Sequence, residues 1–235
     1  MAVDAAGRRA VGYALDRTAL AAQLGPLLGR RSDQYLPLGM PGSRETHLYP
    51  LARPNLAGAR ALARGRGGQA MLWTCNLPVC RTRAEIIRRS LAPLGIHVTV
   101  KSDFPVGGAL VAVGTLGANF DLSPFMSTAD LPDPGSFLRS LFDGSLLRAT
   151  GNTNVSYFDD AVVNARLARA DRLSGPARER AFGRIAADLA RDQAPIAVFS
   201  QPYQAEFVSE RLGCLTEQPV FGGLDLAALC LREDS

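Results

Sequence analysis

Apolar and polar residues repeat along the chain with periods that predict its elements. Near the start, apolar residues recur at three-and-four spacing, which is the spacing of one helix face: Val11, Ala14, Leu15, Ala19 and Ala22. Gly25 and Pro26 are expected to end this helix. Residues 29–54 are rich in Pro, Gly and Arg and predict an extended loop, which a short helix over 55–64 follows.

The clearest local unit lies between residues 70 and 100. Residues 70–74 predict a short apolar strand, and the Thr82–Glu85 pair has the spacing of a capping box at a helix start. The helix that follows has one apolar face: Ala84, Ile87, Leu91 and Leu94. Gly95 can end it in a left-handed conformation, and residues 96–100 alternate as a strand does. The pattern predicts a βαβ unit with parallel strands.

The second half is mainly helical. An edge strand is expected around Phe120, Leu122 and Met126, and a short helix over 136–142. Longer helices are expected over 160–173 and from Pro176 onward, the latter with one apolar face: Phe182, Ile185, Ala186 and Leu189. A last strand over 196–199 and an irregular tail complete the chain. Helices mixed with a parallel βαβ unit indicate the α/β class.

Length and composition fit a globular chain. Its 235 residues suffice for one core, or for one lobe and a smaller piece, with 47% hydrophobic and 20% charged residues. No apolar run approaches the ~20 residues of a membrane span. Met1–Arg9 lacks the pattern of a signal peptide. We therefore expect either a cytoplasmic chain or one whose N-terminal part is missing.

The net charge is +4, and the positively charged residues are almost all arginines, since Lys101 is the only lysine. The arginines are scattered and form no basic stripe with interleaved aromatic residues, so we expect no nucleic-acid partner.

Four cysteines form two local pairs, Cys75 with Cys80 and Cys214 with Cys230. An even count with local pairing favours disulfides in an oxidising compartment, chiefly for the second pair. Four free thiols remain the alternative. The wide second spacing argues against a zinc site, and no metal or cofactor is expected.

Motifs for catalysis are absent from the sequence. No nucleophile elbow, phosphate-binding loop, dinucleotide fingerprint or HExxH motif occurs, and the only histidines are His47 and His97. A carboxylate pair made of Asp130 and Asp133 is more often a turn or a cap than a catalytic pair. We expect a protein that is not an enzyme; a hydrolase using Asp130 and His97 is the weaker alternative.

Residues 129–138 read ADLPDPGSFL and carry a resemblance to a known family. This segment resembles the D-x-x-D-P-x-x-F-L stretch of the family-5 solute-binding proteins, the peptide- and nickel-binding class of bacterial importers. Other segments resemble that family in the same order: residues 9–17 (RAVGYALDR), 84–98 (AEIIRRSLAPLGIHV), 154–160, Arg180 with 192–196, and the tail 214–232. Together they cover nearly the whole chain.

The resemblance implies a class II periplasmic-binding-protein fold. Residues 1–201 would form the C-terminal lobe, and residues 202–235 would return to the first lobe, most of which is missing from this chain. The implied function is the substrate-binding component of an ABC importer, which takes a peptide-like or other small polar solute into an interlobe cleft and delivers it to permease subunits. The implied location is extracytoplasmic, with contact to the membrane only through the permease or a missing lipid anchor.

The resemblance also implies the binding residues. Asp130 would pair with the α-ammonium group of a ligand, because a buried cation needs a carboxylate partner. The residues before it are further candidates: Phe125, Ser127, Thr128 and Ala129. Trp73 and Thr74 join them because parallel sheets bind ligands at the carboxyl ends of their strands. Asp133 is expected to cap the short helix. A degenerate, isolated lobe without transport activity is the other alternative.

Overall fold

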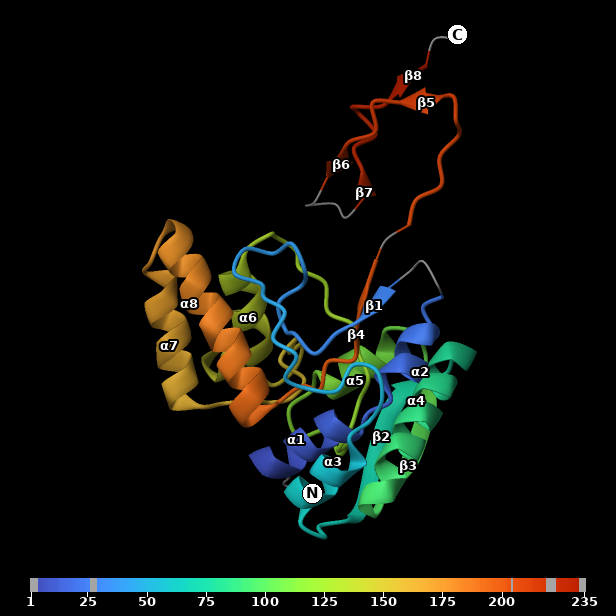
Figure 1. Ribbon diagram of the computed structural model, residues 1–235, viewed down its shortest axis with the longest axis vertical. Helices are drawn as coiled ribbons and strands as arrows, with labels where there is room; N and C mark the ends of the chain where they lie inside the picture. The colour runs from blue at the N-terminus through green and yellow to red at the C-terminus, as the bar shows by residue number, and fades with distance from the viewer. Residues whose placement is uncertain (1–3, 26–28, 204, 219–222, 233–235) are drawn as a thin grey trace.

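The computed structural model describes residues 4–25, 29–203, 205–218 and 223–232. Figure 1 shows a body of helices and short strands from which a C-terminal arm, drawn in orange to red, projects. The body has two hydrophobic cores, one around a pair of parallel strands and one among three helices. Helices combine with a parallel strand pair, so the α/β prediction is confirmed.

The first core contains the βαβ unit that the sequence predicted. Strand β2 (Gly68–Cys75) pairs in parallel with β3 (Ile96–Phe104), and α4 (Pro78–Leu91) with the 3-10 turn η1 (Ala92–Leu94) connects them. Gly95 ends the connection at φ 73°, a value that glycine tolerates best. Trp73 lies opposite Lys101 in the register, and a bulge follows between Trp73 and Cys75.

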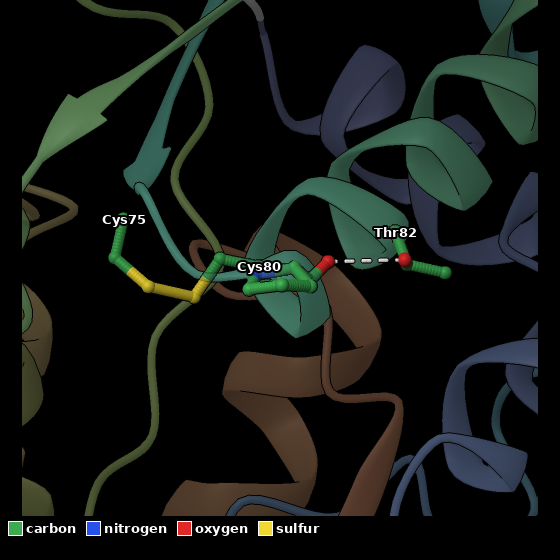
Figure 2. The surroundings of a disulfide bond; sticks show 4 residues. Cys75, Cys80 and Thr82 are labelled. Atoms are coloured by element: carbon green, nitrogen blue, oxygen red, sulfur yellow. Dashed lines mark hydrogen bonds between the residues drawn. A yellow bond between two sulfur atoms is a disulfide. The ribbon is translucent and has the colours of Figure 1, made fainter.

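The start of α4 differs from the prediction. The helix begins at Pro78, so Thr82 lies inside it and is no cap. The Thr82 hydroxyl donates to the carbonyl oxygen of Pro78 at 3.0 Å (Figure 2). Glu85 pairs with Arg88 instead of reaching back to a cap residue. The capping-box prediction was wrong because proline, which favours the first turn, starts the helix four residues earlier.

The predicted first helix is broken in two. Helix α1 (Ala5–Ala14) ends before Leu15, and α2 (Arg17–Ala22) begins after Asp16, whose carboxylate accepts a bond from the backbone N–H of Ala19. Arg17 is almost fully buried and donates to carbonyl oxygens that come from four separate segments: Gly12, Ser32, Pro50 and Val198. The break lets the side chain of Arg17 point into the interior.

A short helix was also predicted after the loop, and it is present as α3 (Leu56–Ala63), which packs against α1.

The predicted strand over 196–199 is also wrong. The strand β4 comprises Ser200–Pro202 and pairs antiparallel with β1 (Gly29–Arg31). Upstream of it, the carbonyl oxygen of Val198 accepts from Arg17 and that of Phe199 from the backbone N–H of Ser32. Around Phe120 to Met126 a single bridge between Leu72 and Leu122 takes the place of the expected edge strand.

The second core is formed by three helices: α6 (Pro134–Phe142), α7 (Ala161–Asp171) and α8 (Gly175–Asp188). The apolar face predicted for the last of these is buried: Phe182, Ile185, Ala186 and Leu189. Two short elements flank these helices, η2 (Gly144–Leu146) and a π turn η3 (Leu189–Gln193). The apolar run near residue 110 forms α5 (Gly108–Val113), which contacts β2.

The arm contains two small antiparallel pairs. β5 (Leu212–Gly213) pairs with β8 (Cys230–Leu231), and β6 (Glu217–Gln218) pairs with β7 (Gly223–Leu224). A disulfide between Cys214 and Cys230 joins the outer pair. None of the helices in the described ranges is long and apolar enough to cross a membrane.

Candidate functional site

Aromatic residues gather at the carboxyl end of β2 and β3. The ring of Trp73 lies 5.1 Å from that of Phe104 and 5.7 Å from that of Phe120, and Phe120 lies 5.9 Å from Tyr157. We call these four residues the aromatic row. Trp73 is half-buried, whereas the neighbouring Thr74 is only 2% exposed and faces the interior. Of the two candidate residues at this strand end, only Trp73 is therefore accessible to solvent.

Lys101 adds a charge to this row. Its ammonium nitrogen lies 5.0 Å from the ring centre of Trp73 and 5.0 Å from that of Phe104. An ammonium group this close to two ring faces is held by cation–π attraction, worth about 0.5–1 kcal/mol per ring at an exposed position. Lys101 itself is exposed. Its charge is therefore positioned at the strand ends and still open to solvent.

Tyr157 fixes the far end of the aromatic row. Its hydroxyl lies 2.7 and 2.6 Å from the carbonyl oxygens of Val113 and Thr115, which share its single proton as acceptors. Burial raises the pKa of this hydroxyl. The backbone of Tyr157 has φ 50°, a left-handed value that bulky residues rarely adopt. The hydrogen bonds to the end of α5 accompany this unusual conformation.

A second group of candidate residues lies on the segment that leads into α6. Phe125 and Ala129 are partly buried and pack against the second core. Ser127, Thr128 and Asp130 are exposed. Among the described residues, Asp130 has no hydrogen-bond or ion-pair partner. Its carboxylate is thus available to a ligand.

Asp133 holds the end of this segment, as the sequence predicted. Its carboxylate accepts a bond of 2.7 Å from the backbone N–H of Ser136 and caps α6. It also pairs with Arg178 of α8, whose guanidinium group lies 3.2 Å from Asp171 as well. The hydrogen bond from Arg178 is the main reason that the pKa of Asp133 lies below its usual value. Asp133 therefore ties the segment with Asp130 to two helices.

Both disulfides expected from the cysteine spacing are present. The Cys75–Cys80 bond joins the last residue of β2 to the first turn of α4 and closes the short loop between them (Figure 2). This bond fixes the chain two residues beyond Trp73. No cysteine among the described residues is free.

A pocket next to the aromatic row shares Tyr157 with it. It has a volume of about 330 Å³ and is lined by residues of α1, of the loop before α7 and of η3, among them Arg8, Tyr157, Asp160 and Gln193. Much of its polar lining already holds the fold together: Arg8 donates to the carbonyl oxygen of Gln193, and Asp160 caps α7. None of the candidate residues around Asp130 lines this pocket.

The weaker alternative, a hydrolase, finds no assembled site. His97 lies opposite Gln69 near the amino end of β3, whereas Trp73 and Lys101 are near the carboxyl end. No hydrogen bond joins His97 to Asp130 in the part of the chain that the structure describes. The same part contains no cluster of three or more His, Cys, Asp or Glu side chains that could hold a metal ion.

Sequence reasoning missed four residues of this surface: Lys101, Phe104, Phe120 and Tyr157. Lys101 and Phe104 lie just beyond the strand predicted over 96–100, and extending its alternation would have placed Lys101 at an outward position. Phe120 and Tyr157 come from distant segments, and no local pattern signals their approach to Trp73.

Comparisons with known proteins come from solved structures alone, since no protein-family model and no curated protein matches this chain. The chain is similar to "Clavulanic acid biosynthesis oligopeptide binding protein 2", with 27% identity and a TM-score of 0.83, over 98% of this chain and 44% of that one. It also resembles the oligopeptide-binding protein AppA of Bacillus subtilis in complex with a nonapeptide (16% identity, TM-score 0.74, 98% and 48% covered).

A third similar structure is the ABC transporter-associated periplasmic binding protein DppA of Helicobacter pylori in complex with a peptide. It has 21% identity and a TM-score of 0.70, over 83% of this chain and 38% of that one. The fold is therefore that of peptide-binding periplasmic proteins, as the family resemblance implied. The chain spans less than half the length of these proteins.

Proposed function

We propose that this chain, which has the fold of the peptide-binding periplasmic proteins of ABC transporters, binds a peptide-like solute and takes part in its delivery to a membrane permease. It acts outside the cytoplasm and without catalysis. The disulfides fit this location, because such bonds persist in oxidising compartments. The similar structures are binding proteins, which supports a role in binding.

One observation carries the proposal most directly: the exposed carboxylate of Asp130 lies on a segment that is fixed at both ends. At one end the segment is bonded to β2 through Leu122, and at the other Asp133 anchors it to α6 and α8. A carboxylate held in place without a partner suits the α-ammonium group of a peptide, since charge-assisted hydrogen bonds are short and strong. We assign Asp130 this role and Trp73 and Phe125 the role of apolar contacts for the ligand.

We further propose that the body formed by residues 1–201 is one lobe and that the arm formed by residues 202–235 packs on another. The arm supports this division because its own apolar side chains are exposed: Phe207 is 91% and Leu226 77% exposed. Figure 1 shows the arm extending away from the body.

Calorimetric titration with a matched pair of short peptides tests the role of Asp130. One peptide has a free amino terminus and the other is N-acetylated. We expect the free peptide to bind at least about tenfold more tightly, a difference of about 1.4 kcal/mol. Asp130→Asn should bring the two affinities together, because the neutral amide cannot pair with the ammonium group.

Asp192→Asn is the matched control, because Asp192 is an exposed carboxylate on η3 that pairs with Arg191. It should leave the preference for the free peptide intact. An Asp130→Asn variant that keeps the full preference would remove Asp130 from the site, and a folded chain that binds neither peptide would overturn the proposed function.

A further inference from the structure

We propose that Lys101, held over the rings of Trp73 and Phe104, recognises a carboxylate of the ligand and that the aromatic row receives the apolar group beside that carboxylate. This inference rests on the proposed function and specifies its substrate class: a zwitterionic peptide whose acidic end carries an apolar or aromatic side chain.

The position of Lys101 follows from the parallel register. Trp73 of β2 and Lys101 of β3 are direct partners, and Phe104 follows on the same strand beyond the bulge. The two rings are 5.1 Å apart and tilted by 42°, and the ammonium nitrogen is 5.0 Å from each ring centre. Two rings therefore restrain a side chain that would otherwise sample many rotamers, which lowers the entropy lost when it binds a ligand.

The ammonium group also has bonding capacity to spare. It carries three donors, and cation–π attraction to ring faces uses none of them as a conventional hydrogen bond. No carboxylate among the described residues forms an ion pair with Lys101. Asp103, two residues further along β3 and also exposed, forms none with it either. A cation in this state suits a carboxylate supplied from outside.

The residues around Lys101 determine which ligand group can lie next to the bound carboxylate. Trp73 and Phe104 present ring surface beside the charge, and Phe120 extends it. Val106, just past β3, is 68% exposed and adds apolar surface. Rings bury large areas at low entropic cost and favour apolar or aromatic partners. A free inorganic anion would use the charge and leave this surface unused.

Asp130 and Lys101 carry opposite charges, and a backbone hydrogen bond connects the segment of Asp130 to the strand that pairs with the strand of Lys101. The carbonyl oxygen of Leu122 accepts the backbone N–H of Trp73, and Asp130 follows eight residues later. Eight residues span at most about 28 Å when fully extended, which limits how far the backbone of Asp130 can lie from that of Leu122. The two charges suit the opposite charges at the two ends of one oligopeptide.

The emission of Trp73 tests this inference, because Trp73 is the only tryptophan in the chain and lies under Lys101. The full chain is titrated with two peptides that differ only at the carboxyl end, one with a free carboxylate and one amidated, both ending in phenylalanine. We expect a saturable change in emission with the free peptide and at least about tenfold weaker binding of the amidated one.

Variants separate charge from packing. Lys101→Met keeps an apolar chain over the rings and should bind both peptides with the weaker affinity, whereas Lys101→Arg should keep the preference for the carboxylate. Thermal unfolding checks that both variants are folded. Arg180→Met, which removes an exposed arginine on α8, is the control and should behave as the unaltered chain does.

The outcomes distinguish this inference from the proposed function. If both peptides bind equally, or if Lys101→Met keeps the preference, Lys101 has no part in recognition and the proposed peptide binding stands. If calorimetry detects no binding of either peptide to the folded chain, the proposed function fails and this inference with it.

Discussion

The backbone N–H of Trp73 donates a hydrogen bond of 2.9 Å to the carbonyl oxygen of Leu122. This bond joins the strand that carries the aromatic row to the segment that carries Asp130. The carboxylate of Asp121 reinforces the junction by accepting the backbone N–H of Met71 at 2.8 Å. The segments that carry the two groups of candidate residues, nearly sixty positions apart in sequence, are therefore joined by backbone hydrogen bonds at this point.

The pairing of Asp133 with Arg178 predicts a defined dependence of stability on pH. Arg178 holds the pKa of Asp133 below its usual 3.8. A carboxyl group whose pKa is lowered by folding stabilises the protein above pH 3.8, and this contribution disappears as the pH falls through the lowered pKa. Asp133→Asn keeps a good helix cap and removes the charge, so it should reduce the free energy of unfolding at pH 7 by no more than about 1 kcal/mol.

Chemical denaturation at several pH values measures the difference in unfolding free energy between the unaltered chain and Asp133→Asn. It should shrink toward zero below pH 3.8, and Arg178→Gln should show the same trend because it removes the other half of the pair. A difference that stays constant down to pH 2 would assign the effect of Asp133 to its capping bond alone.

Arg17 is predicted to be the arginine most important for the stability of the body. Burial lowers the pKa of its guanidinium group to about 10, so the group is still charged at neutral pH. Arg17→Met would leave four buried or partly buried carbonyl oxygens without this donor, and it should cost at least about 3 kcal/mol of unfolding free energy.

Urea denaturation checks this value, with Arg180→Met as an exposed control expected to change it by less than about 0.5 kcal/mol. Equal effects of the two substitutions would show that the buried contacts of Arg17 contribute little.

The disulfide of the arm is expected to act locally. Cys214 and Cys230 are 16 residues apart, and closing a loop of this size restricts the unfolded chain by about 3 kcal/mol. The elements of the arm contact each other in pairs, and several of its apolar side chains, among them Phe207 and Leu226, are exposed. Replacing both cysteines by serine should therefore speed proteolysis within the arm while the melting temperature of the body changes by less than about 2 °C.

Replacing Cys75 and Cys80 by serine is the matched comparison, since this pair lies in the body beside β2. Limited proteolysis and thermal unfolding of both variants are the measurements. A large drop in the melting temperature of the body for the arm variant would show that the arm packs on the body in solution.

Much of the fold could be predicted because its signals are local. The βαβ unit follows from the apolar face of α4 and from Gly95, and the caps Asp133 and Asp160 lie directly before their helices. The error at residues 196–199 arises because a residue distant in sequence satisfies the backbone there. The carbonyl oxygen of Val198 finds its donor on Arg17, so the segment 196–199 needs no strand partner. No periodicity in the sequence can reveal such a bond.

The residues of the candidate site also fall into two groups, those that local sequence patterns predict and those that depend on tertiary structure. Asp130 was found from a family motif, and Trp73 from its place at the end of a predicted strand. Lys101 gains its importance only from the register that sets it opposite Trp73, and Phe120 from a segment 47 residues away. Thr74 shows the reverse case, since alternation turns it inward although it is next to Trp73.

A native mass spectrum of the chain with an added mixture of short peptides tests the central claim most directly. If the chain binds peptide-like solutes, the folded protein should appear with mass increments equal to particular peptides, and zwitterionic peptides with an apolar carboxyl-terminal residue should dominate. A folded chain that shows only its unliganded mass at every peptide concentration would contradict the account.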